Sequence, residues 1–71
     1  MKVTDIMHEA YRAIEGQKPK MVAWVYRDIR NKCYTVYIPG ITHSTGDSSY
    51  PLNDDGLSIA VARADYFLNN V

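Results

Sequence analysis

Residues 21–38 read MVAWVYRDIRNKCYTVYI, and this stretch decides the fold. Valine, tyrosine, tryptophan, isoleucine and threonine dominate it, and these residue types favour the pleated surface of a β-sheet. The polar sequence Arg30-Asn31-Lys32 interrupts the run, and asparagine tolerates the positive backbone dihedrals of a tight turn. The stretch therefore predicts a β-hairpin that turns at residues 30–32.

Strict alternation along the two strands sorts the side chains of this hairpin onto two faces. The face that we expect to form the core is aliphatic and carries Ala23, Val25, Ile29, Tyr34, Val36 and Ile38. The opposite face is aromatic and half polar and carries Val22, Trp24, Tyr26, Asp28, Cys33, Thr35 and Tyr37. The second face is the better candidate for a functional surface.

Upstream of the hairpin, the spacing of the apolar residues predicts a helix over residues 5–15. Thr4 or Asp5 is suited to cap it, because short polar side chains accept hydrogen bonds from the first amides of a helix. Gly16 allows the left-handed stop, and Pro19 prevents continuation. The apolar stripe of this helix would consist of Val3, Ile6, Met7, Ala10 and Ile14.

Downstream of the hairpin, the sequence predicts a short third strand, a long loop and a last helix. Pro39-Gly40 ends the second strand, and residues 41–43 are the candidate third strand. Residues 44–56 are rich in Ser, Gly, Asp and Asn, which predicts a loop. Asn53, Asp54 or Asp55 would cap the last helix. Its apolar stripe would be Leu57, Ala60, Val61, Ala64, Phe67, Leu68 and Val71.

These elements predict one small domain over residues 1–71, since a chain of 71 residues buries only roughly 60% of its unfolded surface. We expect a two-layer α+β fold in the order α-β-β-(β)-α. Its small antiparallel sheet would have two to three strands. Each helix has one apolar stripe, so the N-terminal and the C-terminal helix would both cover the aliphatic face.

Composition excludes several classes of protein. Eight basic and eight acidic residues give a net charge of zero, which argues against a histone-like DNA coat and against an acidic DNA mimic. No run of about 18 apolar residues is present, so we expect no membrane span. The single cysteine precludes an internal disulfide and suits a reducing, cytoplasmic location.

The zero net charge hides an asymmetry between the two halves of the sequence. Residues 1–32 carry seven bases and four acids, a net charge of +3, whereas residues 33–71 carry one base and four acids, a net charge of −3. A dipolar surface of this kind steers encounters with charged partners. An ordinary mixed surface is the alternative.

The side chains that could carry chemistry lack the spacing of a metal or catalytic site. Gly46-Asp47-Ser48-Ser49 is similar to the nucleophile block of some hydrolases, and His43 is the candidate base. A chain of this length rarely supplies the scaffold for such a site. We therefore expect no enzyme, no metal and no cofactor. The candidate metal ligands considered are His8, Cys33, His43, Asp47, Asp54 and Asp55.

Residues 21–69 resemble the HicB-type antitoxin domain. The residues that carry this resemblance are the run Tyr-Thr-Val-Tyr-Ile-Pro-Gly at 34–40, the Gly46-Asp47 step, and Ala60, Ala64 and Leu68 in the last helix. The resemblance implies a protein that masks a partner. The predicted element order is also that of a double-stranded-RNA-binding domain, but Ser58–Ala62 stands where that family has lysines.

We expect a non-enzymatic protein-binding regulator or inhibitor, antitoxin-like or a phage or mobile-element accessory protein. It would act through the hairpin face and the loop at 40–56. The partner would be a protein, and a homodimer is a further expectation. A nucleic-acid-binding module is the alternative, because rings stack on bases while cations neutralise phosphates. The candidate binding residues are Trp24, Tyr26, Arg27, Arg30, Lys32, Tyr37, His43 and Tyr50. A third interpretation is that one of the two predicted helices covers the aromatic face, which would then belong to the core.

Overall fold

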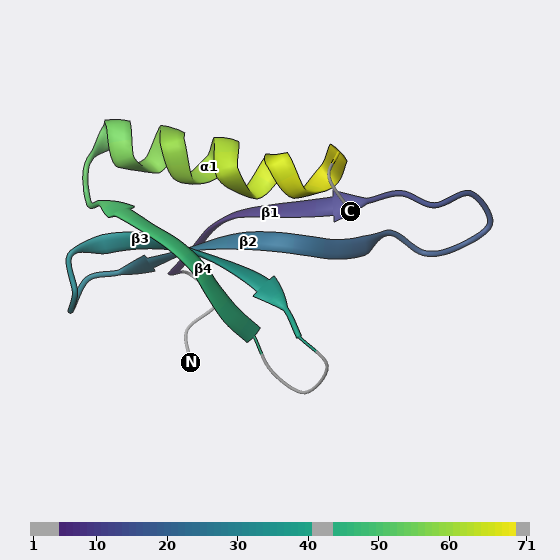
Figure 1. Cartoon of the computed structure of the whole chain (residues 1–71), viewed down its shortest axis with the longest axis horizontal. Coiled ribbons are helices and arrows are strands. Elements are labelled where there is room, and N and C mark those ends of the chain that lie inside the picture. Colours follow the sequence, from purple (N-terminus) through teal and green to yellow (C-terminus); the bar gives the residue numbers. More distant parts are fainter. Residues whose placement is uncertain (1–4, 41–43, 70–71) are drawn as a thin grey trace.

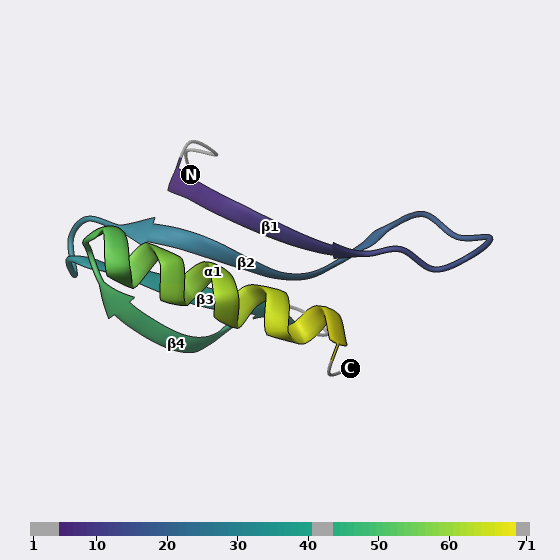
Figure 2. The same cartoon turned by 90° about the horizontal axis from the view of Figure 1, so that it is seen from above.

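Four strands in chain order form an antiparallel sheet, and one helix follows them (Figure 1). The structure, a computed structural model, describes residues 5–40 and 44–69. The elements are β1 (Ile6–Arg12), β2 (Lys20–Asp28), β3 (Cys33–Pro39), β4 (Ser44–Pro51) and α1 (Asp54–Asn69). The helix lies along one face of the sheet, and no described element covers the other face (Figures 1 and 2).

The predicted central hairpin is confirmed. β2 and β3 pair from Trp24 opposite Tyr37 to Asp28 opposite Cys33, so the turn falls at residues 29–32. Lys32 adopts the positive φ of 54° that the turn requires, in place of Asn31. Ile29, which alternation assigns to the core, lies in this turn and is 60% exposed.

The predicted N-terminal helix over residues 5–15 is wrong, because this segment forms strand β1 against β2. An isolated helix of about eleven residues is marginal in water, whereas pairing with β1 satisfies backbone groups of β2 between Lys20 and Tyr26. A register shift between Ile6 and His8 explains the misleading pattern. It places Met7 and Ala10, which are three residues apart, on the same face of the strand, where both pack in the core. Gly16, with φ of 80°, serves the β1–β2 turn and does not end a helix.

The predicted loop over residues 44–56 is also wrong in its larger part, because residues 44–51 form the edge strand β4. The element order is therefore β-β-β-β-α, and the sheet has four strands where we expected two to three. β4 tolerates its serine and glycine residues because water lies along the unpaired side of an edge strand. The predicted strand at residues 41–43 lies outside the described residues.

The predicted C-terminal helix is confirmed, and Asn53 is its cap. The Asn53 side-chain oxygen accepts a hydrogen bond of 2.7 Å from the backbone N–H of Gly56. Asp54 and Asp55 occupy the first turn, where the helix dipole favours negative charge. The stripe packs on the sheet as expected: Ala60 and Ala64 are buried, and Leu57, Val61, Phe67 and Leu68 lie around them.

Small side chains make up the core between α1 and the sheet. The fully buried residues are Ala10, Ala23, Val25, Val36, Ala60 and Ala64. Gly56 is buried as well, and a Cβ atom at this position would overlap the carbonyl group of Pro51. The first turn of α1 therefore lies directly against the end of β4.

Two polar contacts tie α1 to the outer strands. Arg63 donates two hydrogen bonds to Asp47 of β4, at 2.7 and 3.0 Å, and Asp47 is the extra residue of a bulge in that strand. His8 of β1 lies 2.8 Å from Asp65, measured from Nε2 to a carboxylate oxygen. The Arg63 guanidinium also lies over the rings of Tyr66 and Phe67. These contacts fix the direction of the helix across the sheet.

Replacing Gly56 with alanine should destabilise the fold, because the added methyl group forces α1 away from Pro51. Overpacking of this kind costs about 1–3 kcal/mol, which urea unfolding would measure. Gly46→Ala is the matched control, because a Cβ atom there lies 3.7 Å from its nearest neighbours. Equal stability of the two variants would contradict the close approach of α1.

The Arg63–Asp47 contact predicts a pH dependence of stability. Hydrogen bonding from Arg63 holds the pKa of Asp47 below its ordinary value of 3.8. A carboxyl whose pKa is lower in the folded state stabilises the fold above the unfolded pKa, and this stabilisation is lost as the pH falls through the folded pKa. The difference in unfolding free energy between wild type and Asp47→Asn should therefore shrink below about pH 4. A difference that stays constant from pH 7 to pH 2 would refute the contact.

Candidate functional site

The face of the sheet turned away from α1, called the open face below, carries the aromatic side chains of the hairpin. Ala23 and Val25 are buried beneath the helix, so the alternating Trp24 and Tyr26 lie on the other side. Cross-strand register extends the open face over all four strands. Its residues are Ile6, Glu9, Trp24, Tyr26, Cys33, Thr35, Tyr37, Gly46 and Ser49.

Three rings form one cluster at the centre of the open face. Trp24 and Tyr37 are opposite each other on β2 and β3, and their rings stack with centroids 5.7 Å apart and planes inclined by 19°. Tyr26 meets Tyr37 edge to face, at 6.2 Å and 75°. The rings cover one another, which leaves each of them half-buried. They form a rigid apolar platform, because each ring is fixed by its neighbour.

Small polar side chains border the rings on the side of β4. Thr35 and Ser49 share a hydrogen bond of 3.1 Å between their hydroxyl groups, and the Cys33 thiol lies 3.5 Å from the Thr35 hydroxyl. Gly46 lies beside Tyr37 and presents no side chain. The side chains along this border are short and uncharged. A partner that rests on the rings would meet hydroxyl groups there that both donate and accept hydrogen bonds.

Charged residues lie at the margins of the open face. Arg30 and Lys32 are exposed in the β2–β3 turn. In the same turn, Asp28 accepts hydrogen bonds from the side chain and the backbone of Asn31, and these hold the pKa of Asp28 below its ordinary value. Glu9 is exposed on β1 opposite Trp24. The centre of the face is therefore neutral, and its margin carries both signs of charge.

Two residues that the sequence assigned to this site lie elsewhere. Arg27 projects from the side of the sheet that carries Val25, and it lies 3.4 Å from a carboxylate oxygen of Asp5. Tyr50 pairs with Tyr34, and both pack against the core beneath the helix. His43 lies outside the described residues. Strand alternation would have excluded Arg27 from the open face, because adjacent residues of a strand point to opposite faces and Arg27 follows Tyr26.

The structure adds residues to the site that the sequence did not single out. Glu9 was assigned to a helix, and Gly46 and Ser49 were assigned to a loop, so no strand alternation was available for them. Trp24, Tyr26 and Tyr37 were correctly grouped, and Thr35 was correctly placed on the same face. The sequence pattern therefore identified the site residues on the central strands β2 and β3, but not those on the edge strands β1 and β4.

Two of the residues considered for chemistry, Asp47 and Ser48, are held in structural contacts. Ser48 donates a hydrogen bond of 2.9 Å to Asp47, which also binds Arg63. Within residues 5–40 and 44–69, no three His, Cys, Asp or Glu side chains come together to hold a metal ion. Over the same residues, no helix has the length and apolar character needed to cross a bilayer.

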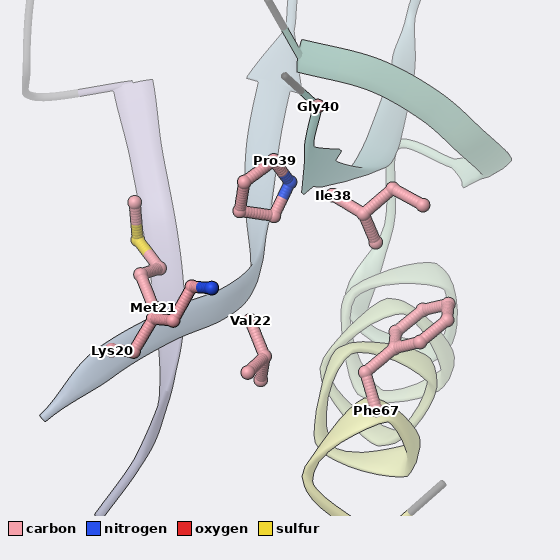
Figure 3. A pocket seen from close by; sticks show the side chains of 7 residues that line it. All are labelled: Lys20, Met21, Val22, Ile38, Pro39, Gly40 and Phe67. Carbon is pink, nitrogen blue, oxygen red and sulfur yellow. The ribbon is translucent and has the colours of Figure 1, made fainter. Parts of the chain in front are cut away.

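A small groove lies where β2 and β3 separate. Their pairing ends at Trp24 and Tyr37, while β2 stays paired with β1 and β3 stays paired with β4. The fork leaves a hollow of about 300 Å³, and Figure 3 shows Val22 and Pro39 between Met21 on one side and Phe67 on the other. Its lining is Lys20, Met21, Val22, Ile38, Pro39, Gly40 and Phe67.

Comparison of the chain with protein-family models, with curated proteins and with solved structures finds no match. The resemblance to HicB-type antitoxin domains therefore stays a prediction.

The stacked pair predicts an energetic coupling between Trp24 and Tyr37. Replacing each residue with leucine, singly and together, isolates the ring–ring term, since leucine keeps most of the apolar area. Stacked aromatic pairs contribute about 0.5–1.5 kcal/mol beyond area burial, and urea unfolding of the four proteins measures it. Additive effects of the two substitutions would contradict the stacked geometry.

Proposed function

We propose that this protein is a small non-enzymatic regulator or inhibitor that binds a protein partner through the open face of its sheet. One observation carries the proposal: the helix covers one face, and the single tryptophan gathers with two tyrosines on the other. A functional surface is the simplest reason to keep such large side chains out of the core of so small a chain.

The composition of the open face supports a protein partner. Tryptophan and tyrosine are the residue types enriched at the energetic centres of protein interfaces, and charged residues are depleted there. Trp24, Tyr26 and Tyr37 form such a neutral centre, and hydroxyl groups surround it. Stacking also restrains the rings before binding, so less conformational entropy is lost when a partner docks.

A nucleic acid is the competing partner, and the charge distribution disfavours it. Binding to a phosphate backbone requires a continuous cationic surface. The end of the face at the β2–β3 turn carries Arg30 and Lys32 but also the acid Asp28, and the acid Glu9 lies on the edge strand β1. A masking role for the protein also agrees with the antitoxin-like resemblance of residues 21–69. Cys33 is a free thiol, which supports our proposal of a cytoplasmic location.

The test is affinity capture of partners from lysate of the source organism with three immobilised proteins. These are the wild type, the double variant Trp24→Ala with Tyr37→Ala, and the control Ile59→Ala on the exposed side of α1. We expect the wild type and the control to retain the same protein, and the double variant to lose it. Removal of one aromatic side chain at the centre of an interface commonly costs more than 2 kcal/mol of binding energy, which is about 30-fold in affinity, and the double variant lacks two such side chains.

Three outcomes would refute the proposal. The double variant could capture the same protein as wild type, or its circular dichroism spectrum could be that of an unfolded chain, which would make the rings part of the core. Retention could also vanish on nuclease treatment and fall steeply with salt, which would identify a nucleic acid as the partner.

A further inference from the structure

We propose that the open face packs against the open face of a second copy of this chain when no other partner is bound. The two sheets would stack around a two-fold axis, with the two helices on the outside. This inference rests on the proposed function, because the dimer would use the same face that binds the protein partner. It adds a consequence for how binding of that partner is regulated. Self-association hides the rings, so a protein partner must compete with the second copy.

The first argument is the exposed area of the chain. Its accessible surface is 5261 Å², whereas a compact monomer of 8.1 kDa should expose about 4,500 Å². The excess is about 750 Å² per chain, close to the area that one partner buries in a standard interface. Residues 11–20, which are all exposed, contribute part of this excess.

The open face can account for part of this excess area. Four strands about 4.8 Å apart and about seven residues long cover a footprint of roughly 450 Å². Two such footprints total about 900 Å², at the lower end of specific interfaces, and accessible area exceeds footprint because side chains protrude. We therefore expect a reversible dimer with a dissociation constant in the micromolar range.

The second argument is the position of apolar bulk. Large side chains lie on both sides of the sheet: Tyr34, Tyr50 and Phe67 pack around the buried alanines and valines on the side of α1, and the cluster of Trp24, Tyr26 and Tyr37 lies on the other side. Two sheets that pack face to face need large side chains between them, because their backbones lie about 10 Å apart. The open face supplies these side chains, and Gly46 beside Tyr37 leaves room for a ring of the other copy.

The third argument is the distribution of charge. The centre of the open face is neutral, so self-association would not bury an unpaired charge. Glu9, Arg30 and Lys32 are exposed at its margin, where they stay hydrated. The chain has a net charge of zero, so two copies do not repel each other as a whole.

The sheet edges and the helix offer weaker alternatives for self-association. A bulge interrupts each edge strand, at Met7 in β1 and at Asp47 in β4, and bulges of this kind blunt an edge against pairing with another strand. The outer side of α1 exposes Ile59 by 50% and Tyr66 by 47%. This stripe is narrow, and Asp55 and Ser58 lie exposed on the same helix. It provides the control for the experiment.

Sedimentation equilibrium of the purified chain, from about 1 µM to about 1 mM, tests the dimer. We expect wild type to pass from monomer to dimer across this range. Trp24→Glu should raise the dissociation constant at least about 30-fold, and Ile59→Glu should leave it within about threefold of wild type. Thr35→Arg adds a long charged side chain beside the rings, so it should also raise the dissociation constant at least about 30-fold. This second variant tests the same face if Trp24→Glu fails to fold.

A wild type that stays monomeric up to about 1 mM, or a dimer that Ile59→Glu disrupts and the open-face variants do not, overturns the proposal. Neither result affects the capture experiment, which tests heterologous binding by the same rings. Conversely, loss of captured protein by the double variant together with a monomeric wild type would retain the proposed function and remove the dimer.

Discussion

The close approach of α1 to the sheet is the constraint on which the rest of the structure depends. Gly56 meets the backbone of Pro51, and Ala60 and Ala64 lie over Val25 and Val36. Larger side chains on this side of the sheet, among them Tyr34, Tyr50 and Phe67, pack around these small residues. Strand alternation places Trp24, Tyr26 and Tyr37 on the opposite face, which the helix does not cover.

The parts of the fold that local sequence signals specify were predictable. The β2–β3 hairpin combines residues that favour strands with a polar turn, and α1 has a cap at Asn53 and a stripe at helical spacing. β1 was not predictable in this way, because a bulge between Ile6 and His8 shifts the alternation and makes the spacing resemble that of a helix. β4 has little apolar content, and pairing with β3 and the contact of Asp47 with Arg63 hold it in place. Both errors concern the edge strands of the sheet, whose own residues carry weaker strand signals and which depend on pairing with one neighbouring strand.

The candidate site follows the same division. Alternation within the hairpin was sufficient to bring Trp24, Tyr26 and Tyr37 together, and residue type was sufficient to mark them as a binding surface. The contributions of Glu9 and Ser49 depend on the edge strands, so they emerge only with the complete sheet. Basic residues near the rings in sequence do not all lie near them in space. Arg27 is adjacent to Tyr26 and lies on the other side of the sheet.

The central claim, that one face of the sheet is packed under α1 and the other is open, can be tested most directly by nuclear Overhauser contacts in the dilute protein. The account predicts contacts between the methyl groups of Ala60 or Ala64 and those of Val25 or Val36, and contacts from the indole of Trp24 to the ring of Tyr37. It predicts none from the Trp24 indole to any residue of α1. A contact between that indole and the helix would contradict the account, because it would place the rings inside the core.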